Sequence, residues 1–213
     1  MQTRVRHLLW LGIAAIASAC AALPATAPGD AHIVYLHGKV VQEQGIDASS
    51  PEYGRYAFRE IVAALGADGA RVHAPVRAPG ATVKDSAEDV AALVRELIAS
   101  GVAAQRITVV AVSHGAVIAM RASTALADAR LSFVLMGACN DWTFNELRPQ
   151  LHGRILSIYE RGDTWGESCR PLVDDAPGVR AFEEIELRTG LAHGYIYRPL
   201  PEWVVPTLAW TRN

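Results

Sequence analysis

Short β-branched runs alternate with longer alanine-rich segments along this chain, and that alternation constrains its fold more than any other feature. Apolar residues at helical spacing predict helices, whereas short apolar runs bounded by glycine predict strands. Their alternation favours a mostly parallel sheet with helices on both faces. The six predicted strands lie at 32–38, 70–77, 106–113, 130–139, 154–163 and 181–188, and the helices lie within 53–69, 85–101, 114–129, 143–153 and 201–212.

Two further local signals concern helix starts and loops. Asp85 or Ser86 ahead of Glu88 predicts a capping box for the helix at 85–101. The segment between the first strand and the first helix is expected to be a loop. Residues 164–178, rich in glycine and proline, are also expected to form a loop.

Residues 1–27 are predicted to be an export signal. Arg4 and Arg6 precede an uncharged apolar run from Leu8 to Leu23, which is nearer in length to a signal-peptide core than to a bilayer span. A retained membrane anchor is the alternative. We therefore expect a protein exported to the periplasm or secreted.

The point at which this signal would be cleaved has two candidates. One follows "ATA" at Ala27, and the other lies just before Cys20, where "ASAC" resembles the lipobox of bacterial lipoproteins except for its alanine at 17. The second site would attach the protein to a membrane by a lipid. In both cases the sequence predicts one folded domain over 28–213, which we expect to be a monomer.

Charge and residue spacing exclude several classes of function. The formal net charge is −2, and it becomes −4 once Arg4 and Arg6 are removed, with the remaining charges interspersed. This distribution presents no basic face for a nucleic acid. The histidines lack metal-ligand spacing, the cysteines at 139 and 169 are far apart, and no glycine-rich phosphate loop is present. We therefore expect neither a metal nor a cofactor.

Ser113 is the candidate nucleophile. It ends the most apolar predicted strand, in "VVAVSHGAV", and an alanine-rich helix follows it. Ala111 and Gly115 complete a G-x-S-x-G pattern with alanine in the first position, and both must be small because strand and helix approach closely at such a turn. The simpler interpretation is a helix N-cap.

The chain from 32 to 213 resembles the α/β-hydrolase family. Four stretches carry the resemblance: "YLHGK", "AVSHGA", "ERGD" and "LAHGY", in the family's Ser, Asp, His order. The chain differs from the family in having Ala111 in place of the usual first glycine of the G-x-S-x-G pattern, and in lacking the family's two earliest strands. The resemblance implies an α/β-hydrolase fold without a large cap, and a serine hydrolase with a Ser-His-Asp triad.

A weakly acidic serine hydroxyl needs a base, and that base needs an orienting carboxylate. His193 is the favoured base because it follows the last strand in the glycine-flanked loop "TGLAHGY". Asp163, after the fifth strand, is the favoured acid. Asp141, after the fourth strand, is its main rival, and Glu160 and Glu167 are further candidates.

An oxyanion hole is the fourth requirement. The backbone N–H of His114 lies at a predicted helix N-terminus, where the helix dipole favours negative charge. "His37-Gly38-Lys39" resembles the family's H-G-X signature, which implies the N–H of Lys39 as the second donor. Gly38 is expected to allow a sharp turn there, and His37 to shape the loop.

Short connections between the predicted elements indicate an open site without a cap. The expected rims are 40–56, 77–85 and 164–178, and three aromatic residues could line the pocket, Trp142, Trp165 and Tyr195. Because the rims are polar, we expect a carboxylesterase for small or polar acyl esters. The polar rim residues are Glu43, Gln44, Arg77, Arg161 and Arg170.

Cys139 and Cys169 are the only cysteines after the signal. An oxidising compartment permits a disulfide between them, although two buried free thiols explain the sequence equally well. The resemblance makes their strands neighbours in the sheet, which favours the bridge.

Two alternatives to the esterase remain. An acyltransferase or thioesterase could use the same acyl-enzyme chemistry. A non-catalytic hydrolase-like protein could bind a small molecule without turning it over.

Overall fold

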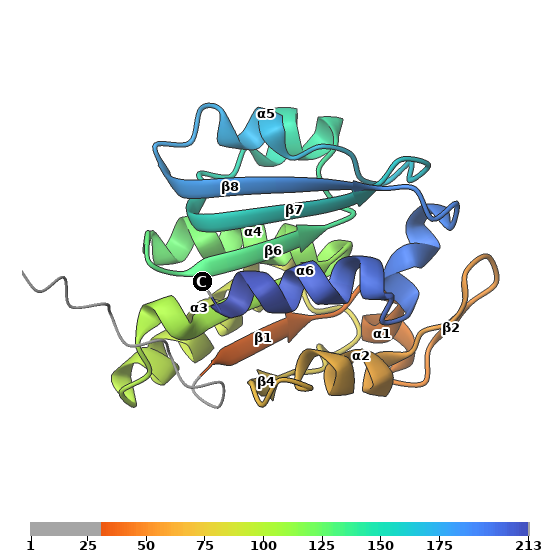
Figure 1. Cartoon of the computed structure of the whole chain (residues 1–213), viewed down its shortest axis with the longest axis horizontal. Coiled ribbons are helices and arrows are strands. Elements are labelled where there is room, and N and C mark those ends of the chain that lie inside the picture. Colours follow the sequence, from red (N-terminus) through yellow and green to blue (C-terminus); the bar gives the residue numbers. More distant parts are fainter. Residues whose placement is uncertain (1–30, 213) are drawn as a thin grey trace, which may run out of the picture.

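A six-stranded sheet in the order β4-β1-β5-β6-β7-β8 forms the centre of the molecule, and every neighbouring pair in it is parallel (Figure 1). The computed structural model describes residues 31–212, so the predicted signal at 1–27 and both of its cleavage sites lie outside the described residues. The strands of the sheet are β1 (His32–Leu36), β4 (Arg71–His73), β5 (Ile107–Val112), β6 (Ser132–Met136), β7 (His152–Glu160) and β8 (Gly178–Leu187).

Helices cover both faces of this sheet, as the sequence predicts (Figure 1). Side chains of a strand alternate between faces, so Val34 and Leu36 of β1 pack with α3 and α4, whereas Ile33 and Tyr35 pack with α2 and α6. The helices are α1 (Lys39–Gln44), α2 (Phe58–Leu65), α3 (Val83–Ala99), α4 (His114–Leu126), α5 (Arg170–Val173) and α6 (Pro201–Arg212).

The segment after β1 differs from the prediction. Helix α1 occupies part of the expected loop, and a small antiparallel hairpin, β2 (Ser49–Ser50) with β3 (Gly54–Arg55), follows it. The predicted helix at 53–69 is therefore wrong in its first turn, because Gly54 turns the chain with a φ of 75°. Helix α2 begins only at Phe58.

Other boundaries also move. Helix α3 begins at Val83 because the Thr82 hydroxyl accepts a hydrogen bond from the Asp85 N–H at 3.0 Å. The predicted capping box is therefore wrong, because Asp85 and Ser86 both lie inside the helix. The predicted helix at 143–153 is a π-helical turn, Thr143–Leu147. The expected loop at 164–178 contains α5. Within residues 31–212 the chain also forms two 3₁₀ helices, Ala104–Arg106 and Ala192–Tyr197.

No large cap rises over the sheet in the part of the chain that the structure describes: the connection from β7 to β8 contains only the short α5, and the connection from β1 to β4 contains only α1, the small hairpin and α2. Because no cap covers it, the carboxyl edge of the parallel strands is open to solvent, and it is at this edge that ligands of such sheets bind.

None of the helices formed within 31–212 has both the length and the apolarity needed to cross a bilayer.

Candidate active site

Ser113 lies on a tight turn between β5 and α4. Its backbone has φ 51° and ψ −125°, and its N–H donates to the carbonyl oxygen of Met136 at 2.7 Å. A Cβ on Gly115 would lie 2.2 Å from the carbonyl oxygen of Leu36, so only glycine fits there. Ala111 is fully buried in the sheet. The close approach of α4 to β1 thus explains the glycine at 115.

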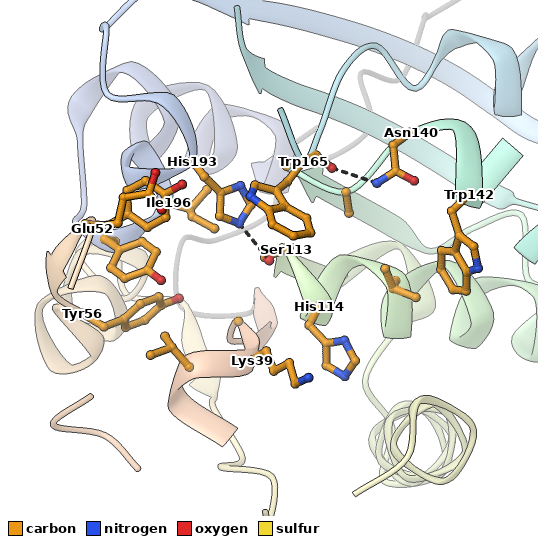
Figure 2. Close-up of a pocket in the computed structure, with 17 residues that line it drawn as sticks. Lys39, Glu52, Tyr56, Ser113, His114, Asn140, Trp142, Trp165, His193 and Ile196 are labelled. Atoms are coloured by element: carbon orange, nitrogen blue, oxygen red, sulfur yellow. Dashed lines mark hydrogen bonds between the residues drawn. The ribbon is translucent and has the colours of Figure 1, made fainter. Parts of the chain in front are cut away.

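A chain of hydrogen bonds joins three predicted residues, and Figure 2 shows the bond between His193 and Ser113. The Nε2 atom of His193 lies 2.9 Å from Oγ of Ser113, and its Nδ1 lies 2.8 Å from Oδ2 of Asp163. The other carboxylate oxygen of Asp163 accepts the Trp165 N–H at 2.8 Å. With Nδ1–H donating to the carboxylate, Nε2 is free to accept the serine proton.

The rival acids occupy other positions. Asp141 is exposed, and the carboxylate that bonds to His193 is that of Asp163. Glu160 is buried, but its carboxylate accepts the N–H and the hydroxyl of Thr189, both at 2.8 Å. Glu167 is exposed and bonds through its backbone N–H to a carbonyl.

Two glycines that the sequence analysis did not single out make room for this chain of hydrogen bonds. Gly137, directly after β6, has φ 61°, and a Cβ on it would lie 3.2 Å from both Oδ2 of Asp163 and Cε1 of His193. A Cβ on Gly166 would lie 2.5 Å from the backbone of Gly137. The available signal was a glycine at the carboxyl end of a predicted strand, as in "LMGAC".

The two predicted oxyanion donors are both first residues of helices. Lys39 begins α1 and His114 begins α4, and an N–H in that position has no partner within its own helix. Both residues line the cavity in front of Ser113 (Figure 2). Burial, followed by the nearby Arg77 and Lys39, lowers the pKa of the His114 imidazole, which favours its neutral form.

The expected role of Gly38 as a sharp turn is wrong. Its φ of −70° and ψ of 174° are available to any residue. A Cβ there would lie 3.7 Å from Cβ of Ser113, at ordinary contact distance. Gly38 therefore leaves space beside the serine instead of bending the chain. His37 is fully buried beneath it, consistent with a residue that shapes the loop.

An open cavity of about 500 Å³ lies in front of Ser113 and His193 (Figure 2). Trp142 and Trp165 line it, as expected, but Tyr195 is fully buried beneath it with its hydroxyl donating to the Ile158 carbonyl. Most of the remaining lining is aromatic or aliphatic and comes from α1, the hairpin region, α4 and the segment after His193: Val40, Tyr53, Tyr56, Val117, Ile196 and Tyr197. Glu52 and Asn140 add polar groups to it.

None of the five polar residues expected at the rim lines this cavity. Glu43 pairs with Lys39, and the Gln44 side chain accepts the Ser49 N–H. Arg161 pairs with Glu186, the Arg170 guanidinium lies over the Phe182 ring, and Arg77 packs inward beneath His37. Long charged side chains have enough reach to find such partners, so their place in the sequence did not fix where they point.

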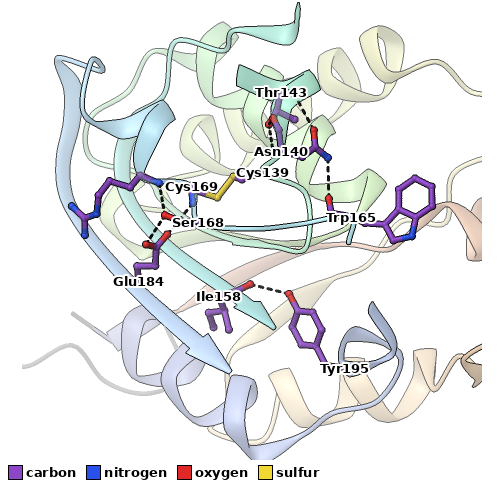
Figure 3. The surroundings of a disulfide bond; sticks show 10 residues. Cys139, Asn140, Thr143, Ile158, Trp165, Ser168, Cys169, Glu184 and Tyr195 are labelled. Atoms are coloured by element: carbon purple, nitrogen blue, oxygen red, sulfur yellow. Dashed lines mark hydrogen bonds between the residues drawn. A yellow bond between two sulfur atoms is a disulfide. The ribbon is translucent and has the colours of Figure 1, made fainter. Parts of the chain in front are cut away.

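A disulfide joins Cys139, after β6, to Cys169, in the connection from β7 to β8 (Figure 3). The Cα atoms are 5.1 Å apart. The side-chain amide of Asn140 donates to the Trp165 carbonyl at 2.9 Å, and the Glu184 carboxylate accepts the Cys169 N–H at 2.9 Å. The loop that follows Asp163 is thus fastened to two strands. Within residues 31–212, no three acidic, histidine or cysteine side chains gather as metal ligands.

Comparison with known proteins gives the same fold. EstE5, in a crystal soaked with p-nitrophenyl butyrate, has 16% identity and a TM-score of 0.60 over 87% of this chain and 78% of that chain. An esterase/lipase from an uncultured bacterium has 16% identity and a TM-score of 0.57, over 86% of this chain and 76% of that chain. SOBER1 from Arabidopsis thaliana has 15% identity and a TM-score of 0.56, over 85% of this chain and 97% of that chain.

At such low sequence identity, the similarity shows a shared fold alone. No curated protein matches the sequence. The model of the alpha/beta hydrolase family matches residues 33–213, which is most of the chain. This chain belongs to the alpha/beta hydrolase family.

Proposed function

We propose that the protein is a serine hydrolase that cleaves carboxylic esters, with Ser113 as nucleophile, His193 as base and Asp163 as the acid that orients it. The observation that carries this proposal is the hydrogen-bonded chain Ser113–His193–Asp163 at the floor of an open cavity. Membership of the family and the esterase structures among its fold neighbours support a hydrolase.

In the proposed reaction, Oγ of Ser113 attacks the ester carbonyl carbon while its proton passes to Nε2 of His193. The carbonyl oxygen becomes an oxyanion, which the N–H groups of Lys39 and His114 stabilise. The leaving alcohol then takes the proton from His193, and an acyl-serine remains. A water molecule gives a proton to Nε2 of His193 as its oxygen attacks the acyl carbon. When the bond from that carbon to Oγ of Ser113 breaks, His193 returns the proton to Oγ and the acid leaves.

The lining of the cavity favours a neutral ester with an apolar acyl group. The charged residues that suggested polar substrates bond elsewhere, and the walls are mainly aromatic and aliphatic. A volume of about 500 Å³ that is open to solvent suits a short or medium acyl chain better than a long one. One fold neighbour was soaked with p-nitrophenyl butyrate, an ester of this size.

We also propose that the protein works outside the cytoplasm, as a monomer without a bound cofactor. The Cys139–Cys169 disulfide supports this location, because such bridges form and persist in oxidising compartments. Cleavage before Cys20 would add a lipid anchor, and cleavage after Ala27 would release a soluble domain.

Labelling with a fluorophosphonate probe tests the nucleophile. Wild type should be labelled, and Ser113→Ala and His193→Ala should not. Labelling that persists in Ser113→Ala would identify a different nucleophile. A folded wild type that takes no label would favour a protein that only binds its ligand.

Hydrolysis of p-nitrophenyl esters of increasing chain length tests the acid and the substrate class. Asp163→Asn should lower kcat by about 10³- to 10⁴-fold, because the imidazole loses the partner that orients it and stabilises its charge. Asp141→Asn is the matched control and should keep wild-type kcat. The opposite result for the two variants would transfer the acid role to Asp141.

A further inference from the structure

A partly buried guanidinium, that of Arg77, lies behind the loop that carries the Lys39 N–H. Nη2 of Arg77 donates to the His37 carbonyl oxygen at 2.6 Å and reaches the Gly38 carbonyl oxygen at 3.5 Å. Nε of Arg77 donates to the Gln42 side chain at 3.0 Å, and Gln42 in turn donates to the Ala81 carbonyl. Arg77 therefore contacts both peptide carbonyls of the loop immediately before Lys39.

This guanidinium is costly where it lies. Within residues 31–212 it forms no ion pair, and its Nη1 is buried with no hydrogen-bond partner. Burial lowers the pKa of Arg77 to about 10, so it remains charged at neutral pH. Burying a charge without a carboxylate partner opposes folding. A charge kept there at a cost to stability suggests a role in the neighbouring loop.

The hydrogen bonds of His37 fix its tautomer. Its Nε2 lies 3.1 Å from the Arg77 backbone N–H, which can only donate, so Nε2 is the acceptor. Burial and the nearby Arg77 charge lower the pKa of His37 to about 4, so the ring is neutral at pH 7. Its single proton is then on Nδ1, which donates to the Gly38 carbonyl oxygen at 2.8 Å. Nη2 of Arg77 lies 3.2 Å from the same Nδ1, and because both nitrogens then carry hydrogens, this contact is not a hydrogen bond.

The Gly38 carbonyl belongs to the same peptide group as the Lys39 N–H. In a trans peptide the C=O and N–H point in opposite directions, and no cis peptide occurs within residues 31–212. With the carbonyl held by His37 and Arg77 behind the loop, the N–H of Lys39 faces the other side. Lys39, Gly38 and Ser113 all line the cavity on that side.

We propose that Arg77 is a positioning residue for the oxyanion hole: it holds the His37–Gly38–Lys39 loop so that the Lys39 N–H points at the developing oxyanion. Its positive charge beside the two carbonyls also polarises the peptides in the direction that strengthens this N–H as a donor. The inference depends on the proposed hydrolase function. It adds a residue that touches neither the substrate nor the reacting atoms.

The test compares Arg77→Met with Arg77→Lys, using p-nitrophenyl butyrate and a trifluoromethyl ketone, whose adduct with serine carries an oxyanion. Arg77→Met should lower kcat by about 10- to 100-fold, less than or similar to the loss of an oxyanion-hole donor, while KM changes by less than about threefold. Affinity for the ketone should fall by the same factor as kcat/KM. Arg77→Lys keeps the charge and one donor nitrogen in place of three, so it should recover part of the loss.

Titration of active sites with a fluorophosphonate corrects every rate for the folded fraction, so a loss of folded protein cannot imitate the effect. Arg121→Met, which removes an exposed arginine on α4, is the matched control and should keep wild-type kcat. If both Arg77 variants fail to fold, Gln42→Leu replaces them. It removes the acceptor of Nε, together with the bond from Gln42 to the Ala81 carbonyl, and should still lower kcat several-fold.

Wild-type kcat and ketone affinity in folded Arg77→Met, or in Gln42→Leu where it is the variant used, would overturn the inference while leaving the hydrolase proposal intact. A wild type that neither hydrolyses the ester nor reacts with the fluorophosphonate would instead overturn the hydrolase proposal.

Discussion

Ser113 occupies a backbone conformation that residues with a Cβ rarely adopt. A φ of 51° with a ψ of −125° is strained, at a cost of order 1–3 kcal/mol. Strand β5 before it and helix α4 after it impose this turn, and the bond from its N–H to Met136 closes it. The strain places the serine hydroxyl at the open edge of the sheet, 2.9 Å from the His193 ring.

Gly115→Ala should destabilise the protein. The added methyl would lie 2.2 Å from the Leu36 carbonyl oxygen and 2.7 Å from that of His37, both of which are backbone atoms that cannot rotate away. We expect a loss of about 1–3 kcal/mol or more in the free energy of unfolding, measured by denaturant titration.

Gly66→Ala is the control for this substitution. Gly66 has an ordinary φ of −89°, and its nearest atoms would lie at 3.5 Å or more from the new Cβ. Its midpoint of unfolding should stay close to that of wild type. A Gly115→Ala variant as stable as Gly66→Ala would show that α4 does not approach β1 as closely as the structure indicates.

At the scale of elements, the loop between β8 and the 3₁₀ helix decides where His193 lies. Glu160, at the end of β7, is only 2% exposed, and its carboxylate accepts three hydrogen bonds from Thr189 and Gly190. These bonds fasten the beginning of that loop to the strand whose end leads to Asp163. The acid and the base are therefore positioned from the same strand.

Glu160→Gln should loosen this loop. Glutamine has nearly the same volume, but it replaces one acceptor oxygen by an amide donor that faces other donors. We expect a loss of about 1–3 kcal/mol in the free energy of unfolding and faster amide exchange at 189–193. Glu183→Gln, on the exposed side of β8, should show neither change. Equal exchange rates in the two variants would contradict this role of Glu160.

The Cys139–Cys169 bridge acts at the same scale, because it connects the ends of neighbouring strands. The two cysteines are 30 residues apart in sequence, and closing a loop of that length contributes about 3 to 4 kcal/mol by restricting the unfolded chain. The double variant Cys139→Ser with Cys169→Ser should lose that amount in denaturant unfolding.

Reducing wild type with dithiothreitol should lower its stability to that of the double variant, and the reductant should leave the variant itself unchanged. Mass spectrometry of the unreduced protein provides an independent check, since the bridge removes two hydrogen atoms. Two thiols that can be alkylated in the native protein would show that no bridge forms.

At the scale of the whole molecule, the sequence predicts the sheet well and the loops poorly. Most strands of the sheet have their own apolar run, and parallel strands bring the residues that follow them to one edge. Together with the Ser, Asp, His order of the family, these places predict Ser113, Asp163 and His193, but they do not distinguish Asp163 from Asp141, which also follows a strand. Helix α1 is only six residues long and has no side-chain cap, and β2 and β3 have two residues each. Elements this short leave no local pattern in the sequence from which they could be predicted.

The direction in which the Arg77 side chain points could not be predicted from the local sequence either. An arginine in a proline- and glycine-containing loop is typical of a solvated rim. Its inward position depends on carbonyls of the chain about 40 residues earlier, which no local pattern reveals. The inward position of Arg77 and the apolar lining of the cavity both depend on tertiary contacts between distant parts of the chain.

The buried loop gives the whole molecule a defined response to acid. The unfolded chain protonates His37 near its ordinary pKa of 6.5, whereas burial and Arg77 lower the pKa in the fold to about 4. The unfolded state therefore binds the proton first as pH falls, and stability is lost from about pH 6.5 down to pH 4. Such a difference in pKa is worth about 3 kcal/mol at neutral pH.

Urea unfolding at pH 7.5 and pH 4.5 measures this loss. His73 and His114, whose pKa values burial also lowers, contribute in the same direction, so the comparison is between wild type and a variant that lacks only the His37 imidazole. His37→Asn keeps an amide donor for the Gly38 carbonyl and cannot gain a proton in this range. The variant should be less stable at pH 7.5 but should lose less stability than wild type on acidification. An equal loss in both proteins would mean that His37 titrates normally in the fold and is not held neutral beneath the loop.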